Sequence, residues 1–279
     1  MAPGALSADG KTVAAVFENE LLAVWTLAGK RATRRLLQLT PSDSYRPLAI
    51  SPTGETLGIA GSRVAQIIDL KGMNARPLRS DRRGPPNRIA FHNGLMGISA
   101  EQSSEAVQLF DIQTHEPIPT LENLGWRIVN DKGQRTSENP SDRFCDLLFD
   151  SRGKVYAGVF SQRAAGLEVR EIGRIRVWDT KTRAELPSIE LPRFSPLSLS
   201  PTSDESIIFV LGQVARNESA IAIVDTGARR VLQTVKVPGD PGIGGDRTLH
   251  VCDTNKLILV ESLERVVVHD AQALVTDAK

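Results

Sequence analysis

Residues 173–192 read GRIRVWDTKTRAELPSIELP, and this stretch decides how the fold of the chain is interpreted. Its first half alternates apolar and polar residues up to Trp178 and Asp179, which is the two-residue period of a strand with one buried face. A polar turn over residues 180–183 follows, and then a second apolar run over residues 186–191. The stretch therefore predicts two antiparallel strands joined by a tight turn.

Weaker copies of this hairpin recur along the whole chain. Each copy has an apolar strand, a turn containing Asp, Gly or Asn, a second strand, a third strand that ends near Asp, and a short final strand. The third strands end at Thr26, Asp69, Asp111, Asp179, Asp225 and Asp270. The gaps between these positions are 43, 42, 68, 46 and 45 residues, and all but the third match a four-stranded repeat of roughly 40–50 residues.

The repeats divide the chain into six segments, which we treat as one domain spanning residues 1–279. The segments cover approximately residues 5–40, 47–79, 87–122, 143–192, 195–237 and 246–279, and the long gap locates an insert at residues 123–143. A short sheet cannot cover both of its own faces, so several such sheets must stack around an axis. The sequence predicts an all-β fold, a β-propeller of about six to seven four-stranded blades.

Turn motifs in several repeats resemble those of a known family. The segments Leu6-Ser7-Ala8-Asp9-Gly10, Ser51-Pro52-Thr53-Gly54 and Ser200-Pro201-Thr202-Ser203-Asp204 resemble the S-P-D-G turn of WD-repeat propellers. Val177-Trp178-Asp179 matches the dipeptide that ends a strand in that family, and residues 222–235, AIVDTGARRVLQTV, are similar to the related YVTN-type propellers of bacteria. The resemblance covers nearly the whole chain and implies the fold. It implies little about function, because propellers serve many unrelated roles.

The chain departs from the WD-repeat pattern in two respects. The Gly-His pair that begins a WD repeat is absent, and only Trp25 and Trp178 stand at the Trp position, so we expect aliphatic packing to hold the blades. The first copy starts close to Met1 without a preceding strand, and the last blade must supply its own outer strand at residues 273–275. Either the ring closes in another way or the sequence is a piece of a longer chain, and we favour the second interpretation.

Composition and charge limit the classes of partner. Lys and Arg total 34 against 33 for Asp and Glu, a formal net charge of +1, so no global field attracts nucleic acid or an anionic membrane. The apolar runs are too short for a transmembrane helix, and the N-terminal residues lack the pattern of a secretory signal. We therefore expect a cytoplasmic protein without a membrane partner. Nucleic-acid binding through the arginine-rich loops ranks third, after a protein partner and a hydrolase activity.

Three segments are candidates for binding another protein. Trp126 and Arg127 lie in the insert, and both residue types are common anchors of interfaces. The alternative interpretation is that residues 126–129 form a strand of the blade and the rest of the insert is a solvated hairpin.

The other two candidates are rich in arginine. Arg163 and Arg170 lie in the charged segment 161–173, which continues to Arg174 and Arg176, and the alternative there is an ordinary solvated face. Arg82 and Arg83 lie in a loop between blades that contains Gly and Pro. That pair is suited to phosphates or acidic side chains, or is simply solvated.

The sequence contains no recognisable catalytic or cofactor motif. The His and Cys residues do not show metal-ligand spacing, and there is no G-x-S-x-G, Walker or dinucleotide fingerprint, so we predict no cofactor. We predict a non-catalytic propeller that acts as a protein–protein interaction scaffold, with another protein or other domains of a longer chain as its partner. The alternative is a lactonase-type hydrolase acting at the central channel, which His92 and His250 on first strands would face.

Overall fold

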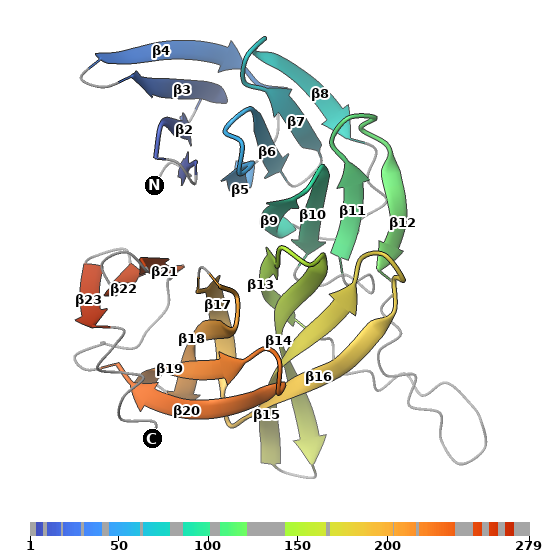
Figure 1. Ribbon diagram of the computed structural model, residues 1–279, viewed down its shortest axis with the longest axis vertical. Coiled ribbons are helices and arrows are strands. Elements are labelled where there is room, and N and C mark those ends of the chain that lie inside the picture. Colours follow the sequence, from blue (N-terminus) through green and yellow to red (C-terminus); the bar gives the residue numbers. More distant parts are fainter. Residues whose placement is uncertain are drawn as a thin grey trace. The chain divides into compact units, whose positions relative to one another are not determined.

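Strands and turns make up the described part of the chain in the computed structural model (Figure 1). The structure describes residues 4–7, 10–17, 19–28, 31–40, 45–61, 64–78, 86–100, 107–121, 143–165, 168–202, 204–215, 218–237, 248–252, 257–261 and 266–270. Within these ranges, no helix is long and apolar enough to cross a membrane. The expected cytoplasmic location stays a prediction.

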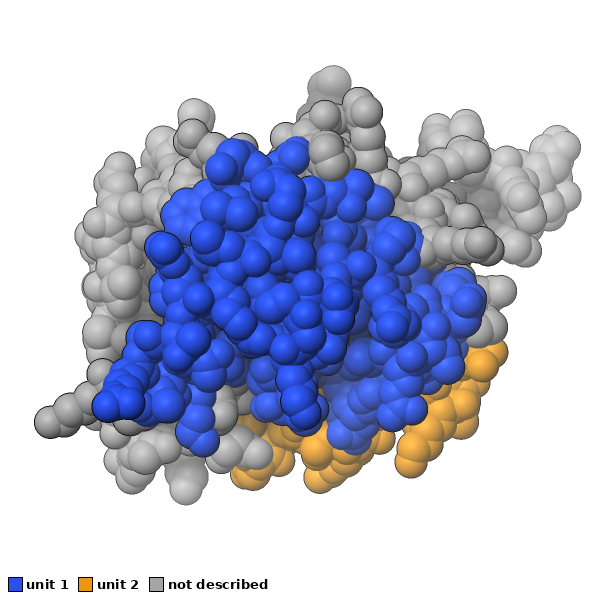
Figure 2. All heavy atoms as spheres, turned by 90° about the horizontal axis from the view of Figure 1, so that it is seen from above, with its two compact units in different colours: residues 1–123 blue, residues 124–279 orange. Residues whose placement is uncertain are grey.

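The chain divides into two compact units, Met1–Asn123 and Leu124–Lys279, which Figure 2 colours separately. Unit 1 contains three antiparallel sheets of four strands each. Sheet 1 comprises β1 (Gly4–Leu6), β2 (Thr12–Val16), β3 (Leu21–Ala28) and β4 (Arg31–Gln38). Sheet 2 comprises β5 (Tyr45–Ile50), β6 (Thr56–Gly61), β7 (Ala65–Asp69) and β8 (Asn74–Leu78). Sheet 3 comprises β9 (Pro86–His92), β10 (Leu95–Ala100), β11 (Val107–Asp111) and β12 (Pro117–Leu121).

Unit 2 contains two four-stranded sheets and one sheet with three strands. Sheet 4 comprises β13 (Arg143–Phe149), β14 (Lys154–Ala165), β15 (Glu168–Asp179) and β16 (Glu185–Pro192). Sheet 5 comprises β17 (Ser195–Pro201), β18 (Ile207–Ala215), β19 (Glu218–Asp225) and β20 (Arg230–Lys236). Sheet 6 comprises β21 (Thr248–Cys252), β22 (Leu257–Glu261) and β23 (Val266–Asp270).

Mainly aliphatic clusters hold neighbouring sheets together within each unit. In unit 1, one face of sheet 1 packs on sheet 2 through Ala14, Val16, Leu22, Val24, Leu57, Ile59 and Ile68. In unit 2, sheets 4 and 5 share a cluster that includes Ile175, Val177, Leu191, Val210, Ala222 and Val224. Alternate residues of a strand point to opposite faces, so these clusters explain the apolar alternation of the sequence.

Aspartates end the third strands, as the sequence predicts, and the structure shows why. The Asp179 carboxylate accepts hydrogen bonds from the backbone amides of Lys181 and Thr182, both at 2.9 Å, and Asp111 does the same for the following turn of sheet 3. Four positions beyond Asp69, Asp111, Asp179 and Asp225 stands a residue with positive φ, respectively Met73 (54°), His115 (63°), Arg183 (61°) and Arg229 (52°). The turn between the third and fourth strands is therefore held in one conformation by its aspartate.

A hydroxyl group caps the turn between the first and second strands. The amides of Thr12, Thr56 and Ile207 donate to the side chains of Ser7, Ser51 and Thr202, respectively. The prediction that Ser200 begins this turn in sheet 5 is wrong, because Ser200 lies within β17 and Thr202 is the cap. Glu205, with φ 56°, consequently occupies the position that Gly54, with φ 73°, holds in sheet 2.

The all-β prediction is confirmed, and the blade count is corrected. The described residues form five four-stranded sheets rather than six or seven, because sheet 6 has three described strands. The strand expected at residues 273–275 lies outside the described residues. The assignment of residues 1–279 to a single domain stays a prediction.

Candidate functional site

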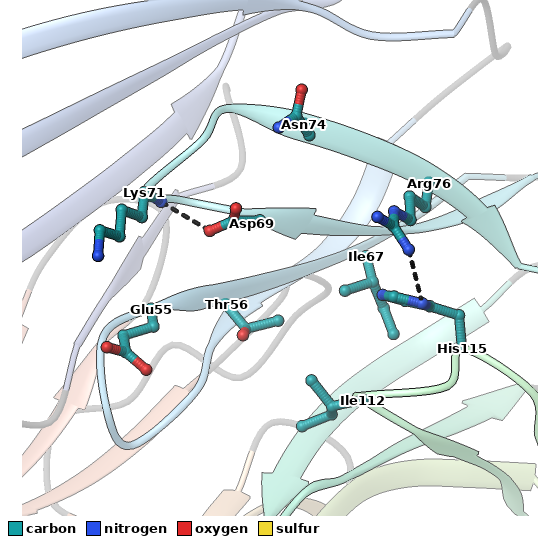
Figure 3. A pocket seen from close by; sticks show the side chains of 9 residues that line it. All are labelled: Glu55, Thr56, Ile67, Asp69, Lys71, Asn74, Arg76, Ile112 and His115. Carbon is teal, nitrogen blue, oxygen red and sulfur yellow. Dashed lines mark hydrogen bonds between the residues drawn. The ribbon is translucent and has the colours of Figure 1, made fainter.

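A cavity of about 290 Å³ lies between sheets 2 and 3 of unit 1 (Figure 3). The turns β5–β6, β7–β8 and β11–β12 meet at this cavity, together with parts of β6, β7 and β8. Its lining residues are Glu55, Thr56, Ile67, Asp69, Lys71, Asn74, Arg76, Ile112 and His115. We call this cavity the sheet 2–3 pocket.

The β7–β8 side of the pocket is fixed by hydrogen bonds. The Asp69 carboxylate accepts the backbone amides of Lys71 at 2.9 Å and Gly72 at 3.1 Å, one on each oxygen. Arg35 of sheet 1 donates from its guanidinium to the carbonyl oxygen of Lys71 at 2.8 Å and to that of Leu70. The turn that carries Lys71 is therefore held from both sides.

The opposite wall is formed by His115 in the β11–β12 turn. Its backbone amide donates to the carbonyl oxygen of Asp111 at 2.9 Å, and its Nδ1 lies 3.4 Å from Nη1 of Arg76. Figure 3 shows the two side chains pointing toward each other. The Thr114 amide, followed by that of Gln113, holds the pKa of the Asp111 carboxyl below its ordinary value, so the aspartate that shapes this turn is ionised at neutral pH.

In unit 2, a side chain joins sheets 4 and 5 between their β13–β14 and β17–β18 turns. Both carboxylate oxygens of Glu205, in the β17–β18 turn, accept the backbone amide of Ser151 at 2.8 Å. Nearby, the Tyr156 hydroxyl donates to Asp150 at 3.3 Å. Burial, followed by the charge of Asp150, raises the pKa of Tyr156. We call the Glu205–Ser151 contact the sheet 4–5 latch.

A buried carboxylate joins the first strands of the three sheets in unit 2. Asp146 on β13 is 7% exposed and accepts hydrogen bonds from the Ser198 hydroxyl at 2.9 Å and the Leu199 amide at 2.7 Å. Ser198 in turn accepts the amide of Leu249 on β21 at 3.2 Å. Burying a charge is costly unless it is hydrogen-bonded, and these donors satisfy Asp146.

Four exposed apolar side chains share one face of sheet 1. They are Leu6 (63% exposed), Leu36 (48%), Phe17 (45%) and Leu27 (37%). Backbone pairing places Leu6 opposite Val13, Val13 opposite Trp25, and Ala23 opposite Leu36, which puts these positions on a common face. This face is the reverse of the one that packs on sheet 2. We call it the sheet 1 apolar face.

The structure describes only some of the residues that the sequence predicts as partner contacts. Trp126, Arg127, Arg82 and Arg83 lie outside the described residues. Arg163 on β14 and Arg170 on β15 are directly paired across an extended hairpin, so their segment is strand rather than loop. Whether any of these residues contacts a partner stays a prediction.

The two arginines that follow in the same charged segment are not solvated. Arg176 is 1% exposed, forms two hydrogen bonds of 2.7 Å to the Glu185 carboxylate, and lies 4.8 Å from the ring centre of Trp178. Arg174 is also buried. The solvated-face interpretation is therefore wrong for these two residues, because the alternation of β15 turns them toward a buried face.

Sequence reasoning missed both the sheet 2–3 pocket and the sheet 1 apolar face. The strand-end aspartates marked the turns around the pocket, but the approach of Arg76 to His115 joins two different repeats. Phe17 and Trp25 were visible as large apolar residues, yet the sequence could not show which face of the sheet a neighbour covers. In the described part of the chain, no three His, Cys, Asp or Glu side chains gather as a metal ion would require.

The sheets define a β-propeller-like, all-β protein. A solved structure of hydrazine synthase from Kuenenia stuttgartiensis is similar, with a TM-score of 0.71 over 99% of this chain and 78% of that chain. The sequence identity is 12%, so the likeness concerns the fold alone. No protein-family model and no curated protein sequence matches this chain.

Proposed function

We propose that this chain is a non-catalytic protein-interaction module built on WD-repeat-like sheets. The observation that supports the proposal is the sheet 1 apolar face, where Leu6, Phe17, Leu27 and Leu36 are exposed together. Several large apolar side chains on one exposed face commonly mark a site that a partner covers in the complex.

The arrangement of the face suits a protein partner. The Phe17 and Trp25 rings meet edge to face, with centres 6.4 Å apart, and form the aromatic part of the face. Arg34 is exposed, and backbone pairing places it opposite Trp25 at the border of the face. Aromatic and arginine side chains dominate the binding energy of many interfaces. We therefore expect a partner with an apolar patch that is bordered by carboxylates.

Paired variants at matched positions test this proposal. Leu36 on β4 and Leu232 on β20 are both on the fourth strands of their sheets and are 48% and 40% exposed, but only Leu36 belongs to the apolar face. We expect Leu36→Lys to reduce recovery of the partner at least tenfold in quantitative cross-linking followed by affinity purification, while Leu232→Lys leaves it unchanged. Equal recovery with both variants would contradict the proposal.

The alternative, a hydrolase acting at a central channel, stays a prediction. The similar solved structure belongs to an enzyme, but a likeness at 12% identity carries no chemistry to this chain. His92 makes a 2.9 Å contact from its Nε2 to the Asn93 side chain, which gives it a local role at the β9–β10 turn. We therefore place the interaction module first.

A further inference from the structure

The sheet 2–3 pocket has features of a ligand site that the proposed function does not use. Strand β8 and the β11–β12 turn place Arg76 and His115 at one end of it. The same end is lined by Ile67 and Ile112, which belong to the apolar packing between the two sheets. The cavity therefore offers hydrogen-bond donors next to an apolar wall, which is the usual composition of a specific small site.

The N–H groups of Arg76 and His115 at this end can donate hydrogen bonds to a ligand. A guanidinium group has no acceptor, so the 3.4 Å contact makes Nδ1 of His115 the acceptor and leaves its Nε2–H as a donor. Arg76 has no carboxylate within ion-pair distance among the residues that the structure describes. The side chain is exposed and lines the pocket, so its other N–H groups can reach a ligand there.

The charges of the pocket limit what can bind. Lys71 and Arg76 are balanced by Glu55 and Asp69, and the Asp69 carboxylate is already engaged with the two backbone amides. A doubly charged phosphate would meet these two acidic residues. A carboxylate carries a single charge and matches the planar fork of the arginine with two parallel hydrogen bonds.

We propose that the sheet 2–3 pocket binds a carboxylate on a short alkyl stem, with Arg76 and His115 holding the head group and Ile67 and Ile112 contacting the stem. The side chain of a glutamate or aspartate in a peptide and a free dicarboxylic acid share this chemistry. The volume of about 290 Å³ accommodates one such group rather than a large cofactor.

Nuclear magnetic resonance of the full chain with labelled histidine tests the proposal. We expect the His115 ring signals, assigned with a His115→Gln variant, to shift on titration with the peptide Ac-Gly-Glu-Gly-NH₂ and not with Ac-Gly-Gln-Gly-NH₂. Titration with sodium glutarate distinguishes the two sources of the carboxylate, because a free acid that binds at least as tightly as the peptide indicates a small-molecule site. Inorganic phosphate is the competing anion, and binding as tight as that of the glutamate peptide would overturn the carboxylate assignment.

Substitutions of Arg76 test whether the glutamate peptide binds in the pocket. Arg76→Gln should weaken binding of the glutamate peptide at least tenfold, and Arg76→Lys should weaken it less, because lysine keeps the charge and loses the planar fork. Arg183→Gln is the control, since Arg183 is an exposed arginine in the β15–β16 turn of sheet 4 and does not line the pocket. Unchanged affinity in Arg76→Gln protein with a native circular-dichroism spectrum would overturn the proposal, as would the absence of any shift with either carboxylate. Neither result bears on Leu36, so this test is separate from that of the proposed function.

Discussion

Sheets 2 and 3 of unit 1 and sheets 4 and 5 of unit 2 are neighbouring sheets with the same strand order, yet a pocket lies between the first pair and the Glu205–Ser151 hydrogen bond joins the second pair. The later sheets of the two pairs differ in the turn between their first and second strands. In sheet 3, β9 ends at His92 and β10 begins at Leu95, so the turn is only Asn93 and Gly94, both with positive φ. In sheet 5 the turn covers residues 202–206, and its Glu205 reaches Ser151 of sheet 4.

The comparison shows that a longer turn can carry a side chain that reaches the neighbouring sheet. The two-residue β9–β10 turn does not line the sheet 2–3 pocket, whereas the longer β17–β18 turn places a carboxylate against sheet 4. Unit 2 also ties its first strands together through Asp146. We therefore expect unit 2 to depend on polar contacts for its stability and the pocket of unit 1 to be free for binding.

The largest effect is expected from removing the buried carboxylate of unit 2. Asp146→Ala leaves the Ser198 hydroxyl and the Leu199 amide buried without this acceptor, and should lower the free energy of unfolding by about 3 kcal/mol or more. Urea denaturation followed by circular dichroism measures the loss. Asp146→Asn keeps one oxygen acceptor and should cost less. If the free energy of unfolding of the alanine variant fell by less than about 1 kcal/mol, the hydrogen bonds through Asp146 and Ser198 would not be what holds the first strands of unit 2 together.

The second-largest expected effect is a loss of stability at alkaline pH. The pKa of Tyr156 is raised in the folded protein, so the native state keeps a proton that the unfolded tyrosine releases near pH 10. The stabilisation is complete below that pH and is lost as the pH rises toward the folded pKa, by up to about 1.4 kcal/mol per pH unit. Urea denaturation of wild-type and Tyr156→Phe protein at pH 8 and pH 11 measures this difference. Parallel pH curves for the two proteins would contradict the assignment.

A smaller effect is expected at the sheet 4–5 latch. Glu205→Ala removes the acceptor for the Ser151 amide and keeps a non-glycine residue at φ 56°, so it should cost about 1 kcal/mol. Glu205→Gly loses the same hydrogen bonds but relieves the left-handed conformation, which is worth about 1 kcal/mol. The glycine variant should therefore be the more stable of the two. If the alanine variant matched the wild type in denaturant, the latch would contribute nothing to closing the junction.

The smallest effect on stability is expected in the open pocket. Arg76 is exposed and its described contact is the long one to His115, so Arg76→Gln should change the free energy of unfolding by less than about 0.5 kcal/mol. The same denaturation experiment as for Asp146 gives a direct comparison of the two units. A loss as large as that of Asp146→Ala would mean that Arg76 stabilises the fold, and the contrast between the units would fail.

Local patterns were sufficient to predict much of the fold. The alternation that ends at Trp178 and Asp179 predicts β15. The recurring aspartates predict the ends of β7, β11 and β19, because each accepts backbone amides of its own turn, and Asp270 also stands at the end of β23. The start of the turn in sheet 5 was misplaced because Ser200-Pro201 imitates the motif that Thr202 in fact begins.

The surfaces could not be predicted in the same way. The contact of Arg76 with His115 and that of Glu205 with Ser151 join residues 39 and 54 positions apart, on different sheets, and no local period encodes such contacts. The burial of Arg176 depends likewise on Glu185 and Trp178 together. Sequence patterns therefore define each sheet, whereas the distances between sheets determine which side chains remain available to a partner.

The most direct test of the interaction module is site-specific photo-cross-linking in cells. A photoreactive amino acid in place of Leu36 should form a cross-link to another protein, because Leu36 lies on the exposed apolar face, whereas the same replacement of Leu232 should not. We predict a discrete higher-mass product at position 36 alone. The absence of such a product at position 36, or an equal product at position 232, would contradict the account.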